Sequence, residues 1–317
     1  MDPRILHRLR CPVCGEPLNE TTAGTARALR CPRRHSFDIA RQGYVNLLAG
    51  RAPHVGDTAE MIAARADFQA AGHYDVISAA LATAATEAVG RLHASAGSGR
   101  HRRTEVSRAK DTTPGVRVEP PVPDVDAYPL VVDAGAGTGR YLGAVLAALP
   151  DAVGLALDVS KPALRRAARA HPRAAAALAD TWQRLPLADT STAVLLNVFA
   201  PRNGPEFHRV LDPAGTLLVV TPDTDHLAEL VDALDLLRVD PEKADRVTAT
   251  LGGHFTEVSS TGHRAELALT RAEAASLVGM GPSAWHTDQV SRTERLAALP
   301  EPVRVTVAVR VAAYRPR

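Results

Sequence analysis

From residue 128 onward, short apolar runs alternate with longer amphipathic stretches. The runs PLVVDAG, AVGLALD, AAALAD, TAVLLNVFA and TLLVVTP are rich in Val, Leu and Ala and have the length of buried strands. Between them lie stretches such as RYLGAVLAAL and KPALRRAARA, whose apolar residues recur at helical spacing. Strands that alternate with helices form βαβ units, so the pattern predicts an α/β fold with a doubly wound, Rossmann-like parallel sheet.

Other patterns flank this alternation. Residues 57–92 predict two helices, broken near Gly72 and His73. The late segments HFTEVSSTGHRAELALT and PVRVTVAVRVAAYR alternate as strands do, and we expect them to pair antiparallel at the sheet edge. Further helices are expected near residues 204–211, 224–237 and 241–251.

A change of composition suggests where the chain divides. Residues 94–127 hold almost no large apolar side chain, which is typical of a flexible linker or an insertion. We therefore expect four parts, which are a small N-terminal domain over 1–52, a helical connector over 53–93, the linker over 94–127 and the Rossmann-like domain over 128–317.

Composition excludes several classes of protein. With 45% apolar and 23% charged residues, the 317-residue chain is neither disordered, collagen-like nor coiled-coil. It has no apolar run of the roughly 20 residues that a membrane helix needs, and its first residues do not resemble a secretion signal. We expect a cytoplasmic protein with no membrane partner.

The charge is unevenly distributed. Although the net charge is only +2, residues 1–51 hold nine arginines and four acidic residues, so this part carries +5 and the remainder is weakly acidic. A basic module on an acidic body indicates a polyanionic partner.

The three cysteines lie in the same basic module, together with a histidine at chelating spacing. Cys11-Pro-Val-Cys14 is followed after sixteen residues by Cys31-Pro-Arg-Arg-His35. Two such turns suit tetrahedral zinc, and four protein ligands leave no open position for water, so we expect one structural Zn²⁺. The alternative is three reduced cysteines in a small core, but about 50 residues scarcely bury enough surface to fold unaided.

A glycine-rich turn follows the first strand of the predicted sheet. The motif VVDAGAGTG places Asp133 at the strand end and then Gly135, Gly137 and Gly139, where glycine lets a ligand approach the backbone closely. A dinucleotide or S-adenosylmethionine would fit such a turn. Because the spacing is G-x-G-x-G rather than G-x-G-x-x-G, we favour S-adenosylmethionine.

Acidic residues also end the next two strands. Asp158 stands nineteen residues beyond Gly139, where a carboxylate can accept hydrogen bonds from ribose hydroxyls. Asp180 ends the third strand and could hold the adenine amino group. A single carboxylate at a strand end is often a helix cap, but three on successive strands indicate a cofactor site.

The fourth strand ends in the segment NVFAPRN, at the edge where ligands of open parallel sheets bind. Here Asn197 offers an amide to a base edge and Phe199 offers a flat face for stacking, so we expect both to position the methyl acceptor. Phe199 could equally be a core residue. The later turn MGPSAWH, with Trp285, could close over the pocket or simply pack.

Together these motifs resemble the large-subunit rRNA guanine-N1 methyltransferases, and most closely the actinobacterial branch that includes tylosin-resistance enzymes. The segments CPVC, CPRRHSFDIARQGYVNLL, GDTAEMIAARADFQAAGHY, VVDAGAGTG, NVFAPRN and MGPSAWH carry the likeness in one order. The resemblance covers residues 5–315, apart from a stretch near 94–125 that looks like an insertion.

The resemblance implies a class I S-adenosylmethionine-dependent methyltransferase with a small zinc-ribbon-like RNA-recognition domain, commonly a homodimer. It implies methylation at N1 of a guanine in a domain II hairpin loop of 23S rRNA, with macrolide resistance as one outcome. Guanine N1 must lose its proton, and Asp180, His286 or water could accept it.

Two other functions fit parts of the pattern. A methyltransferase acting on a small molecule would share the glycine turn, but it would not need the basic module. A non-catalytic zinc-ribbon RNA-binding protein would need that module, but it would not need the acidic residues and glycines of the turn.

Overall fold

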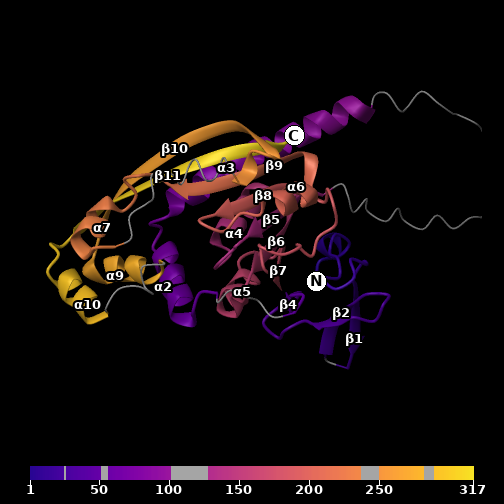
Figure 1. Ribbon diagram of the computed structural model, residues 1–317, viewed down its shortest axis with the longest axis horizontal. Coiled ribbons are helices and arrows are strands. Elements are labelled where there is room, and N and C mark those ends of the chain that lie inside the picture. The colour runs from indigo at the N-terminus through magenta and orange to yellow at the C-terminus, as the bar shows by residue number, and fades with distance from the viewer. Residues whose placement is uncertain (25, 51–55, 101–127, 237–249, 282–288) are drawn as a thin grey trace, which may run out of the picture.

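The computed structural model describes residues 1–24, 26–50, 56–100, 128–236, 250–281 and 289–317. At its centre is an eight-stranded sheet in the order β10-β11-β9-β8-β5-β6-β7-β4 (Figure 1). Its strands are β4 (Tyr44–Asn46), β5 (Leu130–Ala134), β6 (Val153–Asp158), β7 (Ala174–Leu178), β8 (Thr192–Val198), β9 (Leu211–Pro222), β10 (Phe255–Leu269) and β11 (Val303–Pro316).

The sheet has the strand order of a doubly wound fold. Strands β4 to β9 are mutually parallel, whereas β11 runs antiparallel to both β9 and β10. The expected βαβ alternation and the late antiparallel pair are therefore confirmed. Because adjacent parallel strands end at one edge, the residues that follow β5, β6, β7 and β8 lie together.

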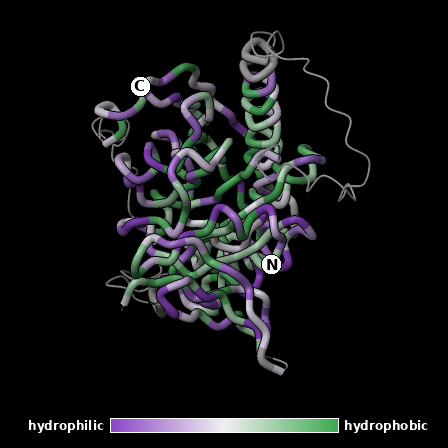
Figure 2. Tube along the Cα trace, turned by 90° about the vertical axis from the view of Figure 1, so that its right-hand side faces the viewer, coloured by the Kyte–Doolittle hydropathy of each residue, from purple (hydrophilic) through white to green (hydrophobic). Residues whose placement is uncertain are grey.

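Helices cover both faces of this sheet. In chain order they are α1 (Pro3–Leu6), α2 (Ala59–Ala70), α3 (Asp75–Arg100), α4 (Arg140–Ala148), α5 (Lys161–Ala167), α6 (Gly204–Val210), α7 (Ala228–Leu234), α9 (Arg271–Gly279) and α10 (Gln289–Ala297). The apolar segments gather in the middle of the molecule, while α3 reaches beyond its body (Figure 2). None of the helices in the described ranges is long and apolar enough to cross a bilayer.

Most expected elements appear close to their predicted bounds. The break near Gly72 separates α2 from α3. The helical run of α3 continues to Arg100, beyond the end expected at residue 92 and into the stretch expected to be a linker. The helix expected at 224–237 is shorter, since α7 covers only Ala228–Leu234. Most of the helix expected at 241–251, of the linker at 94–127 and of the MGPSAWH turn lies outside the described residues.

The N-terminal module is built on a separate three-stranded antiparallel sheet. It consists of β1 (Asn19–Ala23), β2 (Ala26–Arg30) and β3 (Ser36–Asp38). Directly after it, β4 leaves the module and pairs with β7 as the edge strand of the large sheet.

The module and the large sheet share one apolar core. Leu9 and Leu29 of the module are fully buried in the same cluster as Val132 and Leu155 of the sheet. The guanidinium of Arg8 also donates a 2.7 Å hydrogen bond to the carbonyl of Tyr128. The expected division at residue 52 therefore does not coincide with a break in the core.

Candidate cofactor and zinc sites

The glycine turn joins β5 to α4 through backbone conformations that favour glycine. Gly135, Gly137 and Gly139 have φ values of +89°, +54° and +78°. The N–H groups of Gly135 and Ala136 both donate to the carbonyl of Leu157, which holds the turn against β6. A Cβ on Gly139 would lie 2.8 Å from the Cα of Ala167, so helix α5 leaves no room for a side chain there.

Asp158 faces this turn from the end of β6. One carboxylate oxygen accepts a 2.8 Å hydrogen bond from the N–H of Gly137, and the other accepts one of 2.8 Å from Ser160. Burial raises the pKa of Asp158, while these two N–H donors act in the opposite direction. The carboxylate is thus fixed against the turn, where ribose hydroxyls of a nucleoside could reach its remaining lone pairs.

Asp133 lies near Asp158 at the end of β5 and is only 1% exposed. Neither of its carboxylate oxygens has a hydrogen-bond partner among the described residues. Burial, and secondarily the charge of Asp158, raise the pKa of Asp133 to about 8. An unsatisfied buried carboxyl is costly, and the ammonium group of S-adenosylmethionine is a fitting partner for it.

Asp180 follows β7 and completes the row of acidic residues. One carboxylate oxygen accepts a 2.9 Å hydrogen bond from the N–H of Trp182, and the other is buried without a partner among the described residues. Acidic side chains thus lie at the ends of three neighbouring parallel strands along one edge, and two of them have unsatisfied oxygens. This arrangement fits a ligand that presents several hydrogen-bond donors, as S-adenosylmethionine does.

Helix α2 packs over the glycine turn and supplies residues to which the sequence analysis gave no role. The guanidinium of Arg65 pairs with Asp57 at 2.6 Å, and it would lie 3.2 Å from a Cβ on Gly137. The side-chain carbonyl of Gln69 accepts a 2.6 Å hydrogen bond from Thr138. The only sequence signal for these residues is the family resemblance of the segment that contains them.

The segment after β8 contacts the same edge. Asn197 is fully buried, and its Nδ2 donates to the carbonyls of Ala134 and Pro201 at 3.3 and 2.8 Å. Phe199 has a φ of +52° and is 41% exposed, so its ring is not a core residue. Its centroid lies 6.5 Å from that of Tyr74 and 5.9 Å from that of His226, which gives the edge an aromatic wall.

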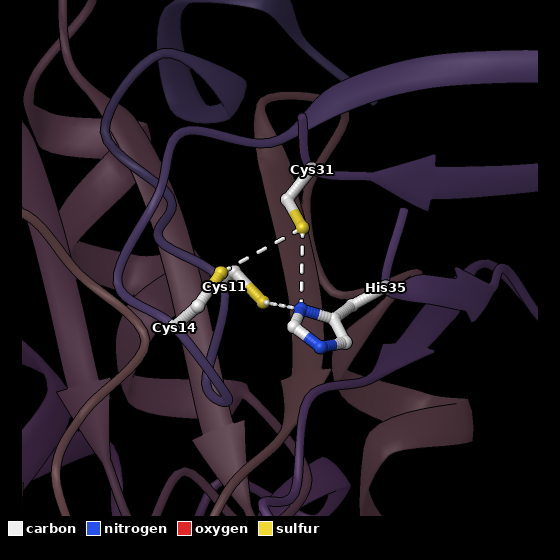
Figure 3. A group of neighbouring side chains, drawn as sticks. All are labelled: Cys11, Cys14, Cys31 and His35. Atoms are coloured by element: carbon white, nitrogen blue, oxygen red, sulfur yellow. Dashed lines mark hydrogen bonds between the residues drawn. The ribbon is translucent and has the colours of Figure 1, made fainter. Parts of the chain in front are cut away.

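The cysteines and the histidine of the N-terminal module converge on one point (Figure 3). The ligand atoms of Cys11, Cys14, Cys31 and His35 all lie within 4.8 Å of one another. The sulfurs of Cys14 and Cys31 are 3.7 Å apart, and His35 Nδ1 lies 3.5 and 3.3 Å from the sulfurs of Cys11 and Cys31. In tetrahedral zinc with bonds of about 2.3 Å to sulfur and 2.0 Å to nitrogen, such atoms lie about 3.5 to 3.8 Å apart.

The local backbone favours this arrangement. Gly15 and Arg34 adopt φ values of +75° and +68°, so that each chelating turn reverses tightly around its ligands. The N–H of Gly15 donates to the carbonyl of Cys11, and that of Arg34 donates to Cys31, each closing its turn. The three thiols and the imidazole form a closed set of four ligands, which suits a structural Zn²⁺ ion.

Known proteins resemble parts of this chain. A zinc-ribbon family model described as "RlmA, N-terminal" matches residues 9–52. A solved structure from Bacillus halodurans, described as a candidate methyltransferase, covers 59% of this chain and 92% of its own at 14% identity, with a TM-score of 0.42.

Curated relatives match much more of the sequence. A protein of Micromonospora griseorubida, described as a proposed 23S rRNA (guanine-N(1)-)-methyltransferase, is 65% identical over the full length of both chains. The 23S rRNA (guanine(748)-N(1))-methyltransferase of Streptomyces fradiae is 45% identical over 100% of this chain and 99% of its own. The chain has the class I methyltransferase fold with an N-terminal zinc ribbon, and it belongs to the family of S-adenosylmethionine-dependent 23S rRNA (guanine-N1)-methyltransferases.

Proposed function

We propose that the chain methylates N1 of a guanine in a domain II hairpin loop of 23S rRNA. The observation that carries the chemistry is the row of Asp133, Asp158 and Asp180 beside the glycine turn. Asp133 and Asp180 have buried oxygens that lack partners in the described part of the chain. The substrate is supported by the full-length likeness to the Streptomyces fradiae enzyme, whose name specifies guanine 748 of 23S rRNA. We propose the same nucleotide here.

Each acidic residue has a separate role in this proposal. Asp133 binds the ammonium group of the cofactor, Asp158 binds the ribose hydroxyls and Asp180 accepts a hydrogen bond from the adenine amino group. Gly135, Gly137 and Gly139 let the backbone approach the cofactor closely, because none has a side chain. The bound sulfonium supplies an already activated methyl group, so positioning of the acceptor provides much of the catalysis.

The segment after β8 positions the acceptor. Asn197 acts indirectly, because its donated hydrogen bonds to Ala134 and Pro201 fix the shape of the loop that carries Phe199. Phe199 presents an exposed ring face on which the target guanine can stack. A water molecule can accept the N1 proton, because the oxygens of Asp180 are engaged by the N–H of Trp182 and by the adenine amino group. His286, another acceptor suggested by the sequence, lies outside the described residues.

The N-terminal module binds the RNA backbone in this proposal. Arg30, Arg34 and Arg41 are exposed, and none of them has an ion-pair partner in the described ranges. Such side chains suit phosphate contacts. Residues 1–52 act as an RNA-recognition unit in this proposal, although their apolar core is shared with the large sheet. The protein acts as a homodimer in the cytoplasm.

Mass mapping of methylated rRNA tests this function directly. Unmodified 23S rRNA is incubated with purified protein and S-adenosylmethionine, then cut into fragments and compared with an Asp158→Asn control. One added methyl on N1 of a domain II hairpin guanine, absent with the control, is the expected result. Cofactor binding without rRNA methylation would instead favour a small-molecule methyltransferase, and absence of cofactor binding would favour a non-catalytic RNA-binding protein.

The biological outcome is tested separately. Expression in a macrolide-sensitive strain that lacks this modification should raise the tylosin concentration needed to stop growth, whereas the Asp158→Asn variant should not. Equal sensitivity of both strains, despite confirmed methylation, would restrict the function to rRNA modification alone.

A further inference from the structure

The loop between β7 and β8 connects the cofactor edge with the zinc module. It begins at Asp180, and its second half pairs with the residues that precede the zinc ligands. The N–H of Arg10 donates to the carbonyl of Pro186 at 3.0 Å, and the N–H of Ala188 donates to Arg8 at 2.8 Å. Any RNA that contacts both the zinc module and the methyl-transfer edge would pass close to this loop.

Arg209 of α6 holds this loop in place through several hydrogen bonds and ion pairs. Its guanidinium donates to the carbonyls of Leu185 and Leu187 at 3.0 and 2.9 Å. It also pairs with Glu206 at 2.6 Å and with Asp189 at 2.7 Å. With its side chain only 15% exposed, Arg209 forms a partly buried clamp that fixes the loop before any ligand arrives.

The same loop is tied to the acceptor segment. The side-chain amide of Asn203 donates a 3.0 Å hydrogen bond to the carbonyl of Thr181. Its neighbour Arg202 is partly buried, and it has no ion-pair partner among the described residues. Burial lowers the pKa of Arg202, as expected for a cation held away from water without a carboxylate beside it.

Trp182 stands exposed on this fixed loop. The residue is 53% exposed, although its backbone N–H donates to a carboxylate oxygen of Asp180. Among the described residues, the exposed large apolar ones are Val13, Trp182, Phe199 and Val258. Val13 lies in the first zinc turn, and Phe199 lies at the acceptor edge. Exposed apolar residues therefore occur at the zinc module, at the acceptor edge and on the loop between them.

We propose that Trp182 stacks on an unpaired base of the rRNA loop next to the target guanine, while Arg202 contacts an adjoining phosphate. This inference rests on the proposed function. Bases of a single-stranded loop are splayed out, and they are bound by stacking on aromatic rings with Arg or Lys on the backbone. An exposed indole on a loop that is tied to the acceptor segment, which carries the unneutralised guanidinium of Arg202, has this chemistry. Stacking would hold the RNA loop open while the guanine enters the pocket.

Steady-state methylation of a domain II hairpin transcript tests the inference with matched variants. Trp182→Ala is expected to raise the KM for the hairpin by roughly 5- to 150-fold, the range for losing one base-aromatic stack. Trp182→Phe keeps a ring and should retain most of the affinity, and the exposed Val258→Ala should behave as wild type. The Kd for S-adenosylmethionine should not change in any of these variants.

Two results would overturn the inference. An unchanged KM in Trp182→Ala would show that the indole does not contact the RNA. A weakened cofactor Kd of the same size would show that Trp182 covers the adenine instead. A wild-type protein that leaves rRNA unmethylated would contradict the proposed function itself, which separates the two failures.

Fluorescence and salt dependence provide independent readouts. Binding of the hairpin should quench tryptophan emission in the wild type but much less in Trp182→Phe, because stacking on a base quenches the indole. Arg202→Gln should lower the slope of log affinity against log salt by about one, as expected for one lost phosphate contact. An unchanged slope would remove Arg202 from the proposed surface.

Discussion

Asp133→Asn is expected to change how the stability of the cofactor-free protein depends on pH. The carboxyl of Asp133 has a pKa of about 8 in the folded chain, against a value of 3.8 when exposed to water. Between these values the folded protein holds a proton that the unfolded chain has released. Its free energy of unfolding therefore falls as pH rises through this window.

The expected size follows from the width of the window. Each pH unit inside it changes the free energy of unfolding by about 1.4 kcal/mol, so raising the pH from 5 to 7 costs about 3 kcal/mol through Asp133. The side-chain amide that replaces this carboxyl in the variant does not titrate, and this part of the pH dependence disappears. The variant should thus gain stability relative to wild type as pH rises.

Urea unfolding at pH 5, 6 and 7 in the absence of cofactor measures this difference, with the exposed Asp151→Asn as a matched control. The gap between Asp133→Asn and wild type should widen by about 3 kcal/mol, whereas Asp151→Asn should follow wild type. Parallel curves for Asp133→Asn and wild type would refute the reasoning, because they would mean that Asp133 is ionised in the folded protein.

Three further changes have specific expected outcomes. Cys14→Ser should lose stoichiometric zinc, measured by elemental analysis, and hairpin binding, measured by gel shift, whereas Val13→Ser at the neighbouring exposed position should keep both. Zinc retained by Cys14→Ser would refute the ligand assignment. Gly139→Ala should lower the Tm and weaken cofactor binding, because the new Cβ would lie 2.8 Å from the backbone of α5. In the control Gly90→Ala the new Cβ has no atom within 4 Å, so this variant should be at least as stable as wild type. Arg209→Met should cost about 2 to 4 kcal/mol in urea unfolding, since it leaves Glu206 unpaired; a loss below about 0.5 kcal/mol would contradict the clamp.

The sequence predicts the fold and the sites best where a residue type has few possible structural roles. The buried strands are apolar on both faces, so continuous apolar runs in the sequence predict a parallel sheet, although they do not predict its strand order. The spacing of Cys11, Cys14, Cys31 and His35 likewise predicted a convergence that the structure shows. Acidic residues at successive strand ends were informative because parallel strands end at one edge.

Other features depend on contacts that no local pattern records. Strand β4 has only three residues, too few to show a period, and its place depends on β7 more than a hundred residues later. Arg65 and Gln69 lie over the glycine turn through tertiary packing of α2, which helical periodicity cannot reveal. Similarly, nothing in the segment NVFAPRN showed that the amide of Asn197 would be buried and bonded to its own loop.

The position of β4 has a consequence for the order in which the protein assembles on the ribosome. All four zinc ligands have been synthesised by residue 35, but the partner strand of β4 begins only at Ala174. At translation rates of about 5 to 20 residues per second, the gap of roughly 140 residues lasts about 7 to 28 s. During that interval the nascent module can bind its metal while Leu9 and Val45 have no sheet to pack against. The module would therefore bind zinc first and dock onto the large sheet second. Without zinc, the chain would have to complete this sheet with an edge segment that follows an unfolded module.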